Sequence, residues 1–331
     1  SRAQNSIVCL ADPAIEALSL ESWSGRKDFD LAGLAFGRVV AYTDGRTTIL
    51  GSDGSWKTAT GPIQFDSIYG GENYDARREM PGWDKAGFDD TNWQAAQVVA
   101  APQGRLVAQM MPPIRATQTI KPVKLTEPKP GVFVFDLGQN FAGYTELTVR
   151  GPAGTRVTLR HGERLFPDGS LDTRDIAQHI KRMGKDQQFQ TDNYTLKGGG
   201  TERWHSRFTY HGFQYVEVTG FPGKPTLDSV RGVFTHSDIP VAGEFECSNP
   251  LLNKIWRAAR WSYLSNLQGI PTDCPHREKN GWTGDAHLAA EQGIYNFLPA
   301  AVYTKWINDL GDEQKPGGQL PGIVPSSGWG Y

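Results

Sequence analysis

The sequence lacks any run of apolar residues close to the roughly 20 that a helix needs to cross a bilayer. It also lacks an opening segment in which positive charges precede an apolar stretch, so we expect a soluble chain and no membrane partner. Neither sign of charge is in excess, because 34 lysines and arginines face 36 aspartates and glutamates, for a net charge of −2. Without a broad positive field, we expect no nucleic-acid partner.

Cysteine is also scarce. Cys9, Cys247 and Cys274 are too few and too far apart for a disulfide framework or a paired-cysteine metal site, so cysteine usage does not settle the compartment. Cys274 could be combined with His276 and His287 as zinc ligands, but this spacing is not a standard one and no further ligand cluster follows. We therefore expect no metal at Cys274 and no cofactor.

Glycine, proline and aromatic residues are plentiful, with 38 Gly, 21 Pro, 10 Trp, 11 Tyr and 15 Phe. Many tight turns between short, aromatic-rich strands are typical of β-sandwiches. A length of 331 residues exceeds what one hydrophobic core usually organises, so two or three domains are expected.

The first region is predicted to be a β-sandwich spanning residues 1–105. Within it, residues 35–50 indicate a hairpin, because apolar residues flank Asp44 and Gly45, a dipeptide suited to a type I′ turn. Turn-rich segments follow, and prolines then mark a connection near residue 105.

A second antiparallel β-sandwich is predicted for residues 106–242. Alternation of apolar and polar residues, as at Val157 to Arg160, is typical of half-buried antiparallel strands. The polar stretch from Leu171 to Gln190 breaks this pattern and predicts a loop or excursion. The runs expected to be strands are 132–137, 144–151, 155–163, 192–198 and 213–220.

Helical periodicity begins after Asn249, which can cap a helix whose first turn opens with Pro250. Residues 287–297 and 300–310 also have helical spacing, whereas the proline- and glycine-rich residues 269–286 predict mostly loop. The fold class is therefore mainly β with C-terminal α, and residues 243–331 form a third, helical region.

The proline- and glycine-rich segment 269–286 contains the candidate functional side chains. Within thirteen residues it holds Asp273, Arg277, Glu278, Trp282 and Asp285. Three carboxylates beside a tryptophan suit glycoside hydrolysis, in which one carboxylic acid protonates the leaving oxygen while other groups hold sugar hydroxyls. Structural caps and salt bridges are the simpler interpretation of such residues in general, so spacing alone does not decide between the two.

Glu278 is the candidate acid in the catalytic interpretation. Its task needs a proton near neutral pH, and carboxylates at Asp273 and Asp285 would disfavour its ionisation. The positive charge of Arg277 would favour ionisation of Glu278 if it pointed at that carboxyl group. We therefore expect Arg277 to face Asp273 or the sugar. Trp282 is expected to provide an apolar wall.

The segment DCPHREKNGWTGDA, residues 273–286, resembles the signature loop of bacterial α-L-rhamnosidases, with Lys279 where an arginine is usual. In that family an aspartate, a glutamate and a second aspartate are the functional acids, and they fall here on Asp273, Glu278 and Asp285. The likeness covers most of residues 50–331. The further segments that resemble the family are GSDGSWK, GGENYDAR, FDDTNWQAA, FDLGQNFAGY, YHGFQYVEV and FECSNPLLNKIW.

The resemblance implies two β-sandwiches followed by a catalytic (α/α)6 barrel, and inverting hydrolysis of terminal α-L-rhamnosyl residues from a rhamnose-containing glycan or glycoside. It implies Glu278 as general acid and a second, downstream glutamate as general base. Twelve barrel helices need roughly 300 residues, whereas about 90 follow Gly243, so we expect these residues alone to be catalytically incomplete. The internal substitutes for the base, more simply interpreted as helix-surface charges, are Glu291, Asp309, Asp312 and Glu313.

Two further sites have alternative interpretations. Oxygen-bearing side chains at Glu72, Asn73 and Asp75 could coordinate calcium or a sugar in the first sandwich, but structural hydrogen bonding is the simpler account. His211 lies in an aromatic strand and is interpreted as a core or interface histidine.

A noncatalytic carbohydrate-binding or scaffold role is the alternative function. The sequence does not determine the aglycone, the linkage, the oligomeric state or the localisation, although analogy favours an extracytoplasmic site. Apolar faces of the first barrel helices are expected to be exposed if nothing covers them.

Overall fold

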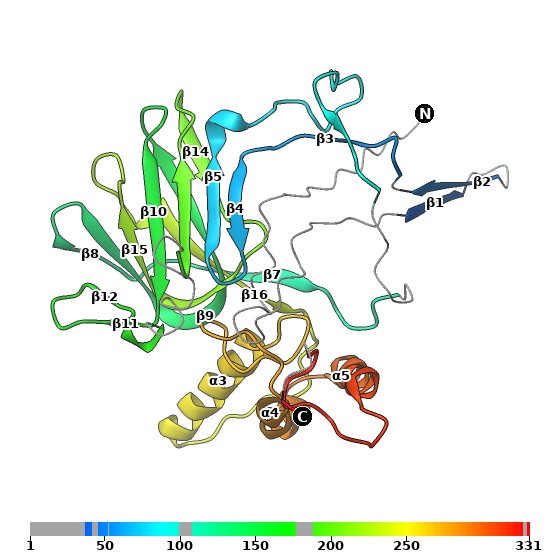
Figure 1. The fold of residues 1–331 in the computed structure, drawn as a ribbon. Coiled ribbons are helices and arrows are strands. Elements are labelled where there is room, and N and C mark those ends of the chain that lie inside the picture. Colours follow the sequence, from blue (N-terminus) through cyan, green and yellow to red (C-terminus); the bar gives the residue numbers. More distant parts are fainter. Residues whose placement is uncertain (1–36, 42–45, 52, 99–107, 177–187, 327–329) are drawn as a thin grey trace.

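In its described residues, the computed structural model shows a curled β-sheet body with the helices α3, α4 and α5 packed against one end (Figure 1). This arrangement confirms the predicted class, mainly β with C-terminal α. Among the described helices, none is long and apolar enough to span a membrane. The residues that the structure describes are 37–41, 46–51, 53–98, 108–176, 188–326 and 330–331.

The predicted N-terminal hairpin is present. Strands β1 (Gly37–Ala41) and β2 (Thr47–Gly51) pair antiparallel, with Val39 opposite Ile49. The predicted turn dipeptide, Asp44 and Gly45, lies outside the described residues. A second small sheet joins β3 (Lys57–Thr58) to β6 (Gln94–Ala95).

Ten strands form the main sheet, in the order β4-β5-β13-β10-β15-β9-β16-β7, with β14 and β8 also paired to β9. Its strands are β4 (Ile63–Ser67), β5 (Gly71–Asp75), β7 (Ile114–Ile120), β8 (Lys124–Lys129), β9 (Val132–Arg150), β10 (Arg156–Gly162), β13 (Thr191–Thr195), β14 (Thr201–Trp204), β15 (His211–Thr219) and β16 (Val230–Ser237).

Strand β9 explains how this sheet curls into two layers. Its first half pairs with β8 and β15, whereas its second half pairs with β14 and β16. The sequence suggested two separate strands here, and the structure joins them through a bend. Gly138 has φ +70° at that bend, and the pairing with β15 shifts register beside it.

The core between the layers follows the predicted alternation. Val157 and Leu159 of β10 are fully buried, whereas Thr158 and Arg160, which alternate with them, are partly exposed. Burial of a large aliphatic or aromatic side chain is worth about 1.5–3 kcal/mol. The largest fully buried aromatic and leucine side chains in the layers are Phe135, Phe141, Phe213, Leu137, Leu147, Leu159 and Leu196.

Strands β4 and β5 enter the main sheet through β13, which pairs parallel to β5 with Tyr194 opposite Tyr74. The other strand pairs are antiparallel among the described residues, as predicted. A parallel pair needs a long connection, which the chain between β5 and β13 supplies. The expected domain boundaries near residues 105 and 242 stay predictions.

The polar excursion contains a short pair of strands, β11 (Arg164–Leu165) and β12 (Leu171–Asp172), followed by the 3-10 helix η2 (Arg174–Ile176). Residues 177–187 lie outside the described part. Two other 3-10 helices are η1 (Ala76–Arg78) and η3 (Leu227–Ser229).

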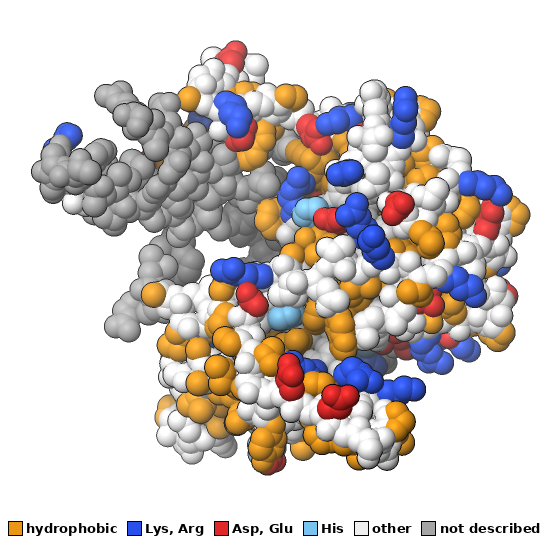
Figure 2. Space-filling model, turned by 180° about the vertical axis from the view of Figure 1, so that it is seen from behind, with side chains coloured by type: hydrophobic (Ala, Val, Ile, Leu, Met, Phe, Trp, Pro, Cys, Tyr) orange, Lys and Arg blue, Asp and Glu red, His pale blue; other side chains and the backbone are white. Residues whose placement is uncertain are grey.

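The helices are α3 (Pro250–Ser265), α4 (Thr283–Asn296) and α5 (Ala300–Glu313). Asn249 caps α3 as predicted, because its side chain accepts a hydrogen bond from the Leu251 nitrogen at 2.9 Å. Apolar side chains gather over these helices in the lower part of Figure 2. The most exposed are Leu251, Ile255, Leu288, Ile294, Tyr295 and Ile307, which agrees with the expected uncovered helix faces.

Candidate active site

The segment between α3 and α4 folds back on itself at the predicted constellation. The Asp273 nitrogen donates to the Asn280 carbonyl at 2.9 Å, and the Asn280 nitrogen donates to Asp273 Oδ1 at 2.9 Å. Lys279 adopts φ +52°, an uncommon value for a residue with a side chain. These contacts close residues 273–280 into a compact turn, which we call the acid loop.

Glu278 is held at three separate atoms. Its backbone nitrogen donates to Cys274 Sγ at 3.3 Å, its carbonyl oxygen accepts from Tyr69 Oη at 2.8 Å, and its Oε2 accepts from Trp282 Nε1 at 2.8 Å. The side chain is partly exposed. The contacts therefore orient a carboxyl group that solvent and ligand can still reach.

Asp273 lies close enough to Glu278 for the two charges to interact. Burial raises the pKa of Asp273, and the charge of Glu278 adds to that rise, while the Cys274 thiol and the Asn280 nitrogen oppose it. Cys274 Sγ donates to Asp273 Oδ2 at 2.9 Å. The buried thiol thus links the Asp273 carboxylate to the backbone of Glu278.

Arg277 lies in the same electrostatic environment. Contact with Cys274, together with the negative charges of Asp273 and Glu278, raises the pKa of its guanidinium. Its charge also extends to Glu163, a partly buried carboxyl group at the end of β10 whose pKa is raised by burial. Arg277 therefore faces the acidic side of the loop, and its contact with a sugar stays a prediction.

Trp282 contacts Glu278 directly, whereas Asp285 lies on helix α4. The Trp282 indole donates a hydrogen bond to Glu278, a contact that the expected apolar wall did not include. Asp285 lies in the first turn of α4 and is exposed, where a negative charge suits the helix dipole. Hydrogen bonds and charges therefore bring Asp273, Arg277, Glu278 and Trp282 together, while Asp285 belongs to the neighbouring helix.

Lys279 anchors the acid loop to the sheet body, a role that the sequence did not indicate. Its Nζ donates to the carbonyl oxygens of Tyr210 and Pro275, each at 2.7 Å, and lies 3.8 Å from the centre of the Tyr210 ring. Burial lowers the pKa of this amine to about 7. A neutral amine still has two N–H groups, so both carbonyl bonds persist above that pH.

A second contact joins the loop to strand β15. A Cβ atom on Gly212 would lie 2.8 Å from Pro275 Cγ and 2.9 Å from the His276 nitrogen, so only glycine permits this approach. His276 is buried between two carboxylates, with Nδ1 3.6 Å from Glu163 Oε1 and Nε2 3.8 Å from Asp175 Oδ2. Each carboxylate therefore approaches a different ring nitrogen of His276.

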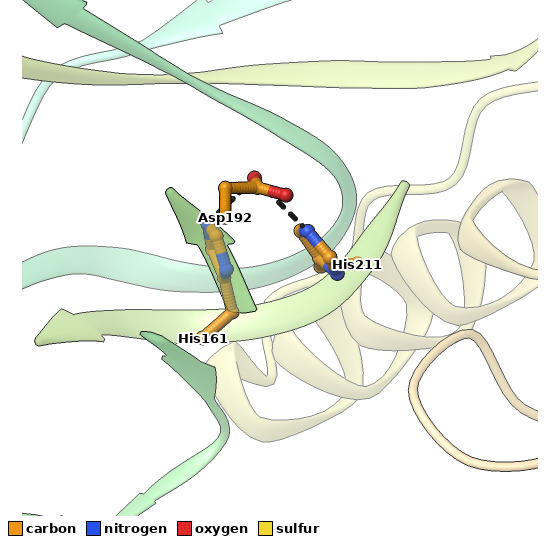
Figure 3. Close-up of side chains that lie close together, drawn as sticks. All are labelled: His161, Asp192 and His211. Atoms are coloured by element: carbon orange, nitrogen blue, oxygen red, sulfur yellow. Dashed lines mark hydrogen bonds and ion pairs between the residues drawn. The ribbon is translucent and has the colours of Figure 1, made fainter. Parts of the chain in front are cut away.

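Strands β10, β13 and β15 contribute a fully buried cluster of His161, Asp192 and His211 (Figure 3). His211 Nε2 lies 3.1 Å from Asp192 Oδ2, and the two imidazoles stack with centroids 4.1 Å apart. These are metal-binding residue types, but lone pairs lie in the ring planes, and stacked planes do not direct them to one point. Burial lowers the pKa of His161 to about 3, so its ring is neutral; its Nε2 lies 2.8 Å from Thr145 Oγ1 and its Nδ1 lies 3.1 Å from the Gln190 carbonyl oxygen.

The other candidate ligands point to protein partners. Glu72 accepts from the Arg207 nitrogen at 2.9 Å, Asn73 accepts from Asn193 at 2.7 Å, and Asp75 pairs with Arg77 at 2.7 Å. Cys274 binds within the acid loop, apart from His276 and from His287, which is exposed on α4. Each of the first three side chains therefore has at least one protein partner, although Glu72 Oε1 is buried without a hydrogen bond.

The internal carboxylates considered as substitute bases lie on or near α4 and α5. Glu291 accepts from Tyr295 at 3.1 Å, and Asp309 pairs with Lys305 at 2.6 Å, one helical turn away. Glu313 accepts from the Ser326 nitrogen at 2.9 Å, and Asp312 is exposed. These contacts agree with helix-surface roles.

Known protein families match almost the whole chain in three consecutive segments. Residues 27–118 match the alpha-L-rhamnosidase N-terminal domain, residues 126–236 match the bacterial alpha-L-rhamnosidase concanavalin-like domain, and residues 240–331 match the bacterial alpha-L-rhamnosidase 6 hairpin glycosidase domain. An alpha-L-rhamnosidase from Streptomyces avermitilis is 44% identical over 292 residues, which are 87% of this chain and 27% of the relative. One from Formosa agariphila is 37% identical over 302 residues, 89% of this chain and 31% of the relative.

Solved structures agree. The alpha-L-rhamnosidase of Dictyoglumus thermophilum superposes with a TM-score of 0.83 at 43% identity, covering 88% of this chain and 32% of that one. The Streptomyces avermitilis enzyme complexed with L-rhamnose gives a TM-score of 0.82 at 43% identity, covering 88% of this chain and 28% of that one. The chain thus spans about a third or less of the length of these relatives. Its three consecutive domain matches and its fold place the chain in the bacterial α-L-rhamnosidase family.

Proposed function

We propose that the protein containing this chain hydrolyses terminal α-L-rhamnosyl residues of glycosides or polysaccharides with inversion, and that Glu278 is its general acid. The observation that carries the proposal is the fixed orientation of Glu278, whose nitrogen, carbonyl oxygen and Oε2 each have a partner while the carboxyl group stays partly exposed. Relatives named alpha-L-rhamnosidase, one of them solved with L-rhamnose, support the substrate class.

The contacts of Glu278 suggest how the proton is held. Because Oε2 already accepts the indole proton of Trp282, the transferable proton belongs on Oε1. Glu278 would give this proton to the glycosidic oxygen as the bond to the sugar breaks through an oxocarbenium-like state. Asp273 and Arg277 would bind sugar hydroxyls, the Trp282 ring would pack against an apolar face of the sugar, and Asp285 would approach from α4.

Inversion needs a second carboxylate that activates water on the opposite face of the sugar, about 6.5–9.5 Å from the acid. We place this general base in residues that follow those described here, since the carboxylates on α4 and α5 have helix-surface contacts. The 331 residues alone are therefore expected to be inactive.

The test is hydrolysis of an alkyl α-L-rhamnoside, whose leaving group needs a proton, by the full-length protein and by its Glu278→Gln variant, with the product anomer followed by NMR. Loss of the general acid should lower the rate on glycosides with poor leaving groups by about 100-fold to 10,000-fold. Glu291→Gln, on the surface of α4, is the matched control and should keep its activity. A full-length protein that binds rhamnose without releasing it from any glycoside would instead establish the noncatalytic carbohydrate-binding alternative.

A further inference from the structure

The acid loop is rigid within itself, but its internal hydrogen bonds do not determine where it lies. The pairs Asp273–Asn280, Cys274–Asp273 and Glu278–Cys274 all join residues of the same turn. Such a turn can move as one body relative to the sheet. Its position must therefore come from contacts with other parts of the chain.

We propose that Tyr69 and Lys279 are positioning residues that tie the peptide between Glu278 and Lys279 to the β-sheet body, so that this body sets where the Glu278 carboxyl group lies. The proposal rests on the proposed role of Glu278 as acid. It assigns to the N-terminal part of the chain a direct effect on proton transfer, although the acid itself belongs to the helical region.

Tyr69 is a well-fixed donor. It lies in the turn between β4 and β5, where Ser67 Oγ accepts from its nitrogen at 3.2 Å and its carbonyl accepts from the Gln190 nitrogen at 2.8 Å. Its ring is buried and stacks on Phe189, with centroids 6.3 Å apart. From this position Tyr69 Oη donates to the Glu278 carbonyl at 2.8 Å. Burial raises the pKa of the phenol, so the proton that makes this bond is retained.

Lys279 provides the second anchor on the other side of the same peptide unit. Its Nζ reaches the Tyr210 carbonyl, immediately before β15, and the Pro275 carbonyl within the loop. The amine therefore joins the loop to the strand that begins at His211. With Tyr69 on one residue and Lys279 on the next, translation and rotation of the Glu278 peptide are both restrained.

A displaced acid has a specific kinetic signature. An alkyl leaving group needs a proton as it departs, whereas a dinitrophenyl group departs as a stable anion without help. A misplaced Glu278 therefore slows the alkyl α-L-rhamnoside much more than the dinitrophenyl one. General loss of folded enzyme lowers both rates by the same factor, so the ratio of the two rates isolates positioning.

The experiment compares both substrates with the full-length protein and its Tyr69→Phe and Lys279→Met variants. Each variant is expected to lower kcat on the alkyl substrate about tenfold or more, and on the dinitrophenyl substrate by less than about threefold. Lys279→Met keeps the volume of the side chain and removes a buried charge, so it should fold. Tyr74→Phe is the matched control. Tyr74 lies on β5, and its phenol donates to Glu79 at 3.1 Å, away from the acid loop.

The outcomes of this experiment distinguish the positioning role of Tyr69 and Lys279 from the proposed function. If Tyr69→Phe and Lys279→Met leave the ratio of the two rates at the wild-type value, whether or not both rates fall, the positioning role is wrong. If the wild type cleaves neither substrate, or Glu278→Gln keeps full activity on the alkyl one, the proposed function fails first. A change of ratio in both variants and in Glu278→Gln, but not in Tyr74→Phe, supports both.

Discussion

Gly212 of β15 lies directly against the backbone of His276, so that a Cβ atom on the glycine would be 2.9 Å from the His276 nitrogen. Real Cβ atoms do not approach a backbone nitrogen this closely, so a larger residue must push the acid loop away. Gly212→Ala is expected to destabilise the protein by about 1–3 kcal/mol and to lower hydrolysis. Urea unfolding and rhamnoside turnover of the variant measure the two effects.

Gly200→Ala is the control for this substitution, because a Cβ atom there meets nothing within 4 Å. It should leave turnover unchanged. Equal effects of the two substitutions would show that the close approach at Gly212 has no importance for the loop.

Cys274 should matter for its hydrogen bonds and not for its redox chemistry. Its thiol donates to Asp273 and accepts from the Glu278 nitrogen, and a serine hydroxyl can do both. Cys274→Ser is therefore expected to keep turnover within about threefold, whereas Cys274→Ala leaves both partners unsatisfied and loses more. Turnover of the two variants, with Cys247→Ala as control, tests this; equal loss in Ser and Ala would contradict it.

Lys279 gives the stability of the protein a dependence on pH. The folded-state pKa is about 7, below the ordinary value of 10.5, so between these values the unfolded chain binds the proton and the folded chain does not. The contribution of Lys279 to the free energy of unfolding therefore rises as pH increases from about 7 towards 10.5. The stability of Lys279→Met relative to wild type should fall over that range in urea titrations. If the stability difference between Lys279→Met and wild type is constant with pH, the pKa of Lys279 is not lowered in the folded protein.

Glu72 has the opposite behaviour. Burial raises its pKa to about 8 from an ordinary value of 4.5, so the folded protein keeps a proton that the unfolded chain releases. Its contribution to stability is present below about pH 4.5 and is lost as pH rises to about 8. Glu72→Gln, which imitates the protonated form, should be more stable than wild type at about pH 8.5 and nearly equal at about pH 5. Unfolding midpoints at the two pH values decide this.

Local patterns in the sequence predicted the elements well. Asn249 before Pro250 marked the start of α3, and the alternation at Val157 and Leu159 marked a half-buried strand. The parallel pairing of β5 with β13 could not be predicted in this way, because no local pattern specifies which distant strands become neighbours. The continuity of β9 through Gly138 was missed for a related reason, since a glycine in a strand indicates either a bend or an end.

The candidate site was predictable where its residues are contiguous. Asp273, Arg277, Glu278 and Trp282 are close together in the sequence and lie together in the structure, although their spacing alone did not decide between a catalytic and a structural role. The contacts that support this turn were not predictable, because they join it to residues that are distant in sequence. Tyr69 in a turn-rich segment gives no local sign that its phenol reaches the Glu278 carbonyl. Lys279 was noted only as standing where an arginine is usual, and only the fold shows that it is buried.

The contacts of the acid loop with the sheet also limit how this chain can be recombined. A protein engineer who joined these β-strands to helices from another relative, cutting between residues 236 and 240 where the family matches meet, would divide a single working unit. In such a chimera, the transplanted loop would have to carry the lysine, and the sheet body would have to carry a compatible tyrosine and glycine. For the same reason, a residue larger than glycine at position 212 of such a chimera would need a compensating change at Pro275 or His276.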